Sequence, residues 1–219
     1  MTIHINSGLK LYMESAIAAP TTITAVTKAA PGVFSASGHT FANGDFVLLE
    51  TQGIQELNGQ LMKVVNIVAS TSFQVAGLDG VTGLDTTLYS TFTSGTAKKV
   101  TLGTSINGVQ DFNPTGGEIK TADSTTVSDT SDKMVVVGAT AQSYDLVMQW
   151  DPASAAQQAM RAAYATLANK GFKVVWPDGA WAAWYGTVGY TGAPGGGKQG
   201  VTTTPAKITQ IGNLVTGAV

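Results

Sequence analysis

The chain has 219 residues, of which 43% are hydrophobic and 12% are charged, and it contains no cysteine. The length allows one all-β domain or two small domains, and the lack of cysteine excludes disulfides and thiolate chemistry. A formal net charge of −2 argues against a basic nucleic-acid-binding surface. The sequence has no run of about 18 apolar residues, so no transmembrane helix is predicted. The N-terminus has no signal-peptide pattern.

The first predicted element is a strand at the start of residues 3–19. The apolar residues there are Ile3, Ile5, Leu9 and Leu11, and they alternate with polar positions. Ser7-Gly8 permits a turn or bulge within this segment.

Short strands and turns fill residues 21–99. The predicted strands are TTITAV, GVFSAS, DFVLLE, QLMKVVNIV, SFQVAGL and AKKV. Turn-forming residues separate them, at Pro31-Gly32, Asn43-Gly44-Asp45, Asn58-Gly59 and Asp79-Gly80. Strands of this number and spacing favour closure into a small barrel.

Longer features return in residues 100–150. VTLGTSINGVQDF precedes a polar stretch, Gly116–Asp132, that lacks periodicity and is predicted to be a long loop. Loops of this length within a compact domain are usually functional or disordered. KMVVVG and SYDLVMQW follow as strands. One face of the second strand carries Tyr144, Leu146, Met148 and Trp150.

The one clear helix signal is Asp151–Gly171. Asp151 is expected to cap its N-terminus, with Pro152 at the first helical position. An apolar stripe follows along one face, formed by Ala156, Met160, Ala163 and Leu167. Lys170 suits the last turn, and Gly171 ends the helix.

Strands resume after the helix. Pro177-Asp178-Gly179 joins FKVVW and AWAAWYGTVGY as a hairpin. GAPGGGKQGVTTTP is expected to be a flexible surface loop, and KITQIGNLV a last strand or arm. The first strand therefore belongs with residues 100–219, and the predicted barrel at 21–99 is inserted between them.

Two patterns could be taken for ligand sites, and a structural role is favoured for both. Gly192, Gly197 and Lys198 match the start of a phosphate-binding loop, but Gln199 replaces its Ser or Thr and no helix follows. The only histidines, His4 and His39, lie in different modules, which argues against a shared metal site. We expect a structural hydrogen-bonding role for His39.

The carboxylates give no clear catalytic or metal-binding pattern. Asp145 and Asp151 could pair as in glycosidases, but Asp151 is assigned to the helix cap and Asp145 to the polar face of a strand. Asp123, Asp129 and Asp132 lack the spacing and the glycine of a calcium loop. No catalytic residue, metal site or cofactor is therefore expected.

Three tryptophans, Trp176, Trp181 and Trp184, cluster around the predicted hairpin. They could form a platform for stacking sugars, although large aromatics on paired strands more often belong to a core or a subunit interface. A carbohydrate-binding virion or surface module that uses this face is the alternative function.

Residues 21–99 resemble a small barrel module of phage virion proteins and are similar to a half-domain of ubiquitin-activating enzymes. The matching features are H-x-F-x-N-G-D-x-V-x-L at His39–Leu49, the turn Glu56–Gly59, and V-x-N-I-V followed by S-x-F-x-V. The resemblance carries no catalytic residue.

The remaining residues resemble the siphophage tail tube proteins, also called major tail proteins. The resemblance rests on the order of ADSTTVSDTSDK, SYDLVMQWDP, AAQQAMRAAYATLANKG, FKVVWPDGAWAAWYGTV and TTTPAKITQIGNLV. It implies a mainly β fold, a tail-tube β-sandwich or barrel with one flanking helix, here with the small all-β barrel inserted. The departure from the family is this insertion.

The resemblance also implies a structural role in the virion. Hexameric rings of the protein, made in the host bacterial cytoplasm, would stack into a non-contractile tube through which DNA passes without specific binding. Tape measure, tail-tip and terminator proteins are the implied partners. The inserted barrel is expected on the tube exterior, with possible weak contact to the host surface. The long loop is expected to bridge subunits through Glu118, Lys120, Asp123, Thr126, Asp129 and Asp132.

Overall fold

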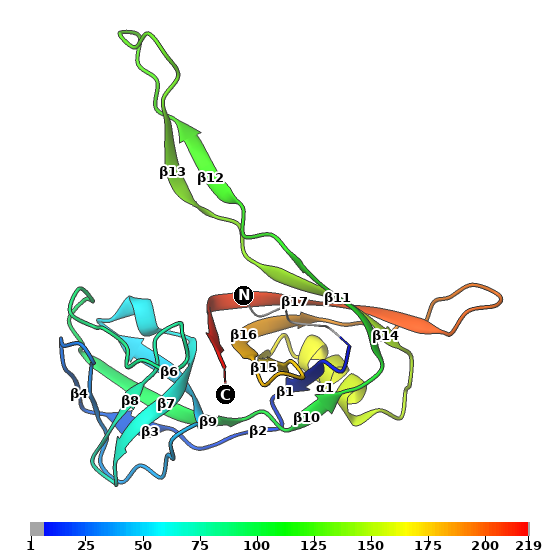
Figure 1. Ribbon diagram of the computed structural model, residues 1–219, viewed down its shortest axis with the longest axis horizontal. Coiled ribbons are helices and arrows are strands. Elements are labelled where there is room, and N and C mark those ends of the chain that lie inside the picture. The colour runs from blue at the N-terminus through cyan, green and yellow to red at the C-terminus, as the bar shows by residue number, and fades with distance from the viewer. Residues whose placement is uncertain (1–6, 219) are drawn as a thin grey trace.

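The structure is a computed structural model that describes residues 7–218. One of its sheets has seven antiparallel strands (Figure 1). Their order is β10 (Thr104–Ile106), β1 (Lys10–Met13), β15 (Asn169–Val175), β16 (Trp181–Gly189), β17 (Thr203–Gly217), β14 (Ser143–Gln149) and β11 (Val109–Thr115). The chain enters this sheet at β1 and leaves it after Met13. It returns to the sheet at β10, which begins at Thr104. Of the residues predicted to form the first strand, Ile3 and Ile5 lie outside the described residues, and Leu11 is buried in β1.

One face of the seven-stranded sheet is covered by α1 (Ala155–Ala165), the one α-helix among the described residues. The core between them contains large side chains from six strands, including Met13, Ile106, Leu146, Phe172, Trp184 and Ile208. Tyr144, Leu146 and Met148 of β14 point into it as expected, because successive strand residues alternate between faces. The predicted mainly β fold with one flanking helix is confirmed.

Residues 16–101 form a second, smaller β body beside the first (Figure 1). Its strand order is β2 (Ala16–Ile17), β9 (Ser94–Thr101), β6 (Phe46–Gln52), β7 (Gln60–Val68), β8 (Ser72–Val75), β5 (Phe34–Ser35) and β4 (Ala25–Val26), with β3 (Thr21–Ile23) also paired to β9. A short 3₁₀ helix, η1 (Gln55–Leu57), follows β6. Each predicted strand segment of residues 21–99 contains a strand of the structure, and Phe34, Leu49, Leu61 and Phe73 lie in the core.

The two bodies share a tightly packed contact through Trp181. This side chain belongs to β16 but packs into the core of the eight-stranded sheet, where its ring meets Phe46 edge to face with centroids 5.4 Å apart. The Nζ atoms of Lys63 and Lys173 lie 4.9 and 5.8 Å from the Trp181 ring centroid. Desolvation, with a smaller contribution from Lys63, lowers the pKa of Lys173.

The C-terminal end of β17 also contacts the small β body, through backbone hydrogen bonds. The backbone N–H of Asn213 donates to Gln60 Oε1 at 2.7 Å, and the N–H of Thr216 donates to the Leu78 carbonyl at 2.9 Å. Both acceptors lie in the small β body. The contact between the bodies is therefore apolar at its centre and hydrogen-bonded at its edge.

The helix is shorter than the sequence predicts. It begins after Ser154, and Asp151 instead accepts the N–H of Ala153 at 3.0 Å in a turn before the helix. Asp151 is thus not the helix cap, because the chain needs Pro152–Ser154 to turn away from β14. Lys170 and Gly171 lie in β15, where Lys170 pairs with the buried Glu14 at 2.9 Å.

The apolar stripe is confirmed for Ala156, Met160 and Ala163 and wrong for Leu167. Leu167 follows the last helical turn with φ of +51° and is 77% exposed. A residue in the left-handed conformation commonly ends a helix, and here the side chain of that residue, Leu167, leaves the stripe.

Substitutions at Met160 and Leu167 should therefore have opposite effects on stability. Met160→Ala leaves a cavity at a fully buried position and is expected to lower the free energy of unfolding by about 2–5 kcal/mol. Leu167→Gly relieves a left-handed backbone strain and is expected to raise it by about 1 kcal/mol. Urea denaturation of the purified subunit measures both, and a large loss on changing Leu167 would contradict the assignment.

Candidate assembly surface

A long hairpin projects from the seven-stranded sheet, away from both β bodies (Figure 1). It consists of β12 (Ile119–Asp123) and β13 (Met134–Ala139), which pair only with each other, and we call residues 118–140 the arm. The arm leaves β11 and returns into β14. Gly116 and Gly117 immediately precede it with φ of +84° and +79°, and a side chain at Gly116 would meet the Ala141 carbonyl. This backbone bend directs the arm out of the sheet.

The stem of the arm, β12 and β13, has no core of its own. Every residue of both strands is exposed, including the apolar run MVVV at the start of β13. The exposed large hydrophobic residues of the stem are Ile119, Met134, Val135, Val136 and Val137. Exposed apolar surface of this kind is typical of protein–protein contacts, because contact with a partner removes the apolar side chains from water.

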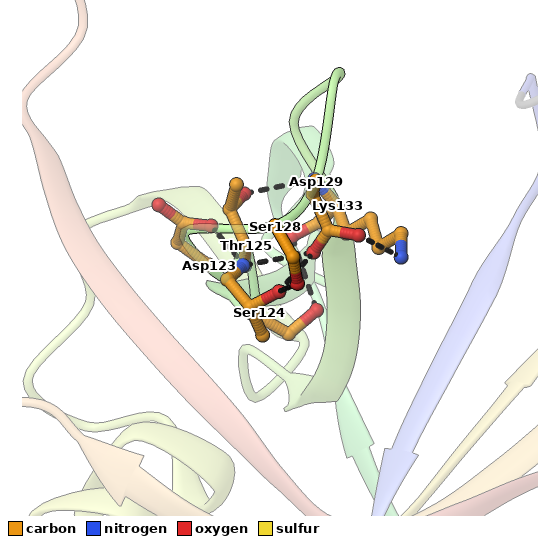
Figure 2. A network of polar contacts seen from close by, with 7 residues as sticks. Asp123, Ser124, Thr125, Ser128, Asp129 and Lys133 are labelled. Atoms are coloured by element: carbon orange, nitrogen blue, oxygen red, sulfur yellow. Dashed lines mark hydrogen bonds and ion pairs between the residues drawn. The ribbon is translucent and has the colours of Figure 1, made fainter.

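The tip of the arm is ordered by a local polar network (Figure 2). The Thr126 N–H and hydroxyl donate to Asp129 Oδ2 at 2.8 and 2.9 Å, and Lys133 pairs with the same carboxylate. Ser124 and Lys133 close the tip, because the Ser124 N–H donates to the Lys133 carbonyl at 2.8 Å. The tip is therefore a folded turn.

Two carboxylates, one in the tip and one at the end of β12 beside it, are stabilised in their charged form. The Lys133 ammonium, and then hydrogen bonds from Thr126, hold the pKa of Asp129 below its ordinary value of 3.8. Hydrogen bonds from Thr125 lower the pKa of Asp123 in the same way. The pKa values of both carboxyls in the folded protein lie below those in the unfolded chain. Their ionised forms therefore stabilise the folded tip above about pH 4, and this stabilisation is lost as the pH falls through the folded pKa values.

Acid should accordingly open the tip before it unfolds the rest of the subunit. We expect the exchange protection of the Thr126 amide to fall below about pH 4, as measured by NMR at several pH values. Asp129→Asn should remove that dependence. Asp85→Asn, at an exposed turn of the small β body that is also held by a threonine, should leave Thr126 unchanged. A Thr126 amide that ignores both pH and Asp129 would contradict the network.

The structure corrects the predicted loop Gly116–Asp132. Its first part is strand β12, which pairs with the KMVVVG strand, so only the tip is irregular. The structure places the six predicted bridging residues along the arm: Glu118 at its base, Lys120 and Asp123 in β12, and Thr126, Asp129 and Asp132 in the tip. The prediction overlooked the apolar stem, although the uninterrupted MVVV run was a visible signal.

The residues considered for catalysis have structural contacts. Asp145 accepts from Thr115 Oγ1 at 3.2 Å and lies 3.5 Å from Lys207 Nζ. His39 is buried, and its Nε2–H donates to the carbonyls of Val68 and Ser72 at 3.1 and 3.0 Å, which joins the two ends of the β7–β8 turn. His4 lies outside the described residues. Lys198 is followed by strand β17, where a phosphate-binding loop needs a helix.

No metal site is found within residues 7–218, where no group of three or more His, Asp or Glu side chains has a suitable arrangement. Asp123, Asp129 and Asp132, which lack the spacing of a calcium loop, belong to no such group. In the same described range, no helix is long and apolar enough to cross a membrane.

The three tryptophans do not share a face. Trp184 is fully buried and points to the α1 side of the sheet, whereas Trp181 points to the small β body. Trp176 is half-buried against the α1-side core. Because alternate faces of β16 carry Trp181 and Trp184, they cannot stack one sugar, and the alternative of a carbohydrate-binding face loses its platform.

The chain was also compared with known proteins. A family model described as "Phage tail tube protein, TTP" matches residues 52–217. The match runs from the end of β6 to the end of β17 and so includes strands of both β bodies, the arm and the helix. None of the curated proteins matches the chain.

Proposed function

The chain belongs to the phage tail tube protein family, and from this premise we propose that it assembles as stacked hexameric rings into the non-contractile tail tube of a siphophage, through which DNA is delivered. Membership of this family makes it a structural component of the virion that self-assembles into a tube. The ring number, the stacking and the passage of DNA are the proposed parts.

The observation that carries the proposal is the arm. A two-stranded hairpin without a covering layer is at best marginally stable in water, yet here it exposes a row of valines and methionine. A ring in which each subunit contacts the next through different surfaces is a closed heterologous assembly. The arm supplies one such surface, and its residues from Glu118 to Asp132 are proposed to contact neighbouring subunits.

The charge of the chain supports a conduit for DNA. Each phosphate neutralised by Lys or Arg adds salt-dependent affinity, so a lumen that lets DNA slide must not be strongly basic. A net charge of −2 per subunit fits this requirement. DNA is proposed to pass without specific binding, and no enzymatic activity is proposed.

The division into domains follows the same proposal. Residues 1–20 and 100–219 form the tube core, and residues 21–99 form an inserted domain on the tube exterior, where it meets neither DNA nor the ring stack. The Trp181 contact supports a fixed position for that domain relative to the core. Its contact with a host surface, and the tape measure, tail-tip and terminator proteins as partners, also belong to the proposal.

Electron microscopy of the purified protein tests the function. Hollow tubes with six-fold end views and a central channel are expected on concentration. A protein that stays monomeric at all concentrations and salt conditions would refute tube formation by this chain alone.

A further inference from the structure

We propose that in the assembled tube the stem of the arm is buried on both of its faces, between neighbouring copies of this chain. The inference rests on the proposed function and names what the arm contacts. It follows from which residues occupy each face of the β12–β13 ribbon.

The pairing register assigns the two faces. Thr121 lies opposite Val136 and Asp123 opposite Met134, while Ala122 lies opposite Val135. Directly opposed residues of an antiparallel pair share a face, and successive residues alternate. Ile119, Met134 and Val136 therefore occupy one face, and Ala122 and Val135 occupy the other. Val136 is 63% exposed and Val135 is 52% exposed, so the part of the subunit that the structure describes covers neither face.

Other strands of the same chain show what this pattern requires. β14 contacts one core, and its buried residues Tyr144, Leu146 and Met148 alternate with the less buried Asp145, Val147 and Gln149. β6 begins with the uninterrupted apolar run FVLL, and all four residues are buried because the strand is covered on both sides. β13 begins with the uninterrupted run MVVV and has no cover on either side. A strand resting on one neighbouring surface would need only the alternating pattern.

The chemistry of the stem identifies the occupant as more of the same chain. β13 carries no charged residue, and the charged residues of β12 are confined to Lys120 and Asp123. A matching surface must then be poor in charge, because an unpaired charge would be buried against it. Only 12% of this chain is charged, and the family to which it belongs assembles from copies of one subunit. The folded tip lets the hairpin enter such an interface already ordered.

Three isosteric substitutions test whether both faces are buried. Val135→Thr and Val136→Thr keep a β-branched side chain and change one face each, while Val81→Thr makes the same change at a 63% exposed position in the small β body. The critical concentration for tube formation is measured by sedimentation. We expect each stem variant to raise it about tenfold, since a buried methyl is replaced by a hydroxyl, and Val81→Thr to leave it unchanged.

The outcomes separate this inference from the proposed function. A wild-type chain that never polymerises overturns both. Wild-type tubes with an effect at only one of the two stem positions show a stem lying on one surface, and they overturn the inference alone. Wild-type tubes with no effect at either position also overturn it.

A second readout does not depend on variant stability. Because the chain contains no cysteine, Val135→Cys and Val136→Cys each introduce a single thiol. The rate of maleimide labelling is compared between subunits and tubes. At least about tenfold slower labelling at both positions in tubes is expected, and a thiol that stays freely reactive at either position contradicts burial of that face.

Discussion

Joining Gly117 directly to Ala141, which removes the arm, is expected to abolish tube formation while leaving the subunit folded. Thr115 and Ser143 are already paired, so Gly116, Gly117, Ala141 and Gln142 would form a short hairpin connection. None of the deleted residues belongs to either hydrophobic core. The free energy of unfolding should therefore stay within about 1 kcal/mol of the wild-type value.

The loss of assembly should be large because the deletion removes the whole apolar stem. We expect no tubes at concentrations about 100-fold above the wild-type critical concentration, which corresponds to about 2.8 kcal/mol of lost contact per subunit. Negative-stain microscopy and sedimentation measure the result, and urea denaturation supplies the folding control. Tubes of normal length from the shortened chain would show that the arm is dispensable and would remove the main support for the proposed function.

Trp181→Ala is expected to have the largest effect on stability, a loss of about 3–5 kcal/mol. The side chain is 5% exposed and fills the contact between the two β bodies, against Phe46 and beneath Lys63 and Lys173. Gly80 and Gly217 lie so close to its ring that a Cβ at either would be about 2.7 Å away or less. Such a closely fitted ring leaves a cavity when it is truncated.

The pattern of unfolding should change as well as its midpoint. With the contact weakened, calorimetry is expected to resolve two transitions in place of one, because each β body keeps a core of its own. Trp150→Ala provides the matched control, since Trp150 is 38% exposed and belongs to neither core, and its loss should stay below about 1 kcal/mol. An equal effect at both tryptophans would contradict a special role for the contact.

Local patterns of the sequence predicted most of the elements. QLMKVVNIV coincides with β7. The alternation in SYDLVMQW put Tyr144, Leu146 and Met148 on one face, and all three are buried in the core, whereas Trp150 lies beyond the end of β14 and is 38% exposed. Met160 was placed on the buried side of the helix for the same reason, since a helical or strand period reports which side chains share a face. The resemblance to tail tube proteins, which rested on the order of these elements, is confirmed by the family match.

The errors arose where a local signal competed with a longer-range one. Asp151 is a good capping residue, but the chain first has to leave β14, so the helix starts after Ser154. The polar composition of Gly116–Asp132 suggested a loop, yet its first part pairs with the apolar strand Met134–Ala139. Trp181 and Trp184 looked like one cluster, although strand alternation sends them to different cores.

The sequence by itself determined the β class, most of the strands, the buried side of the helix and the family resemblance. Only the tertiary structure decided which face of each strand is covered, that Trp181 joins the two bodies, and that the valines of β13 remain exposed within residues 7–218. The physical reason is that periodicity depends on neighbours along the chain, whereas coverage depends on residues far apart in sequence. For the arm, we infer, those residues lie in other copies of the chain.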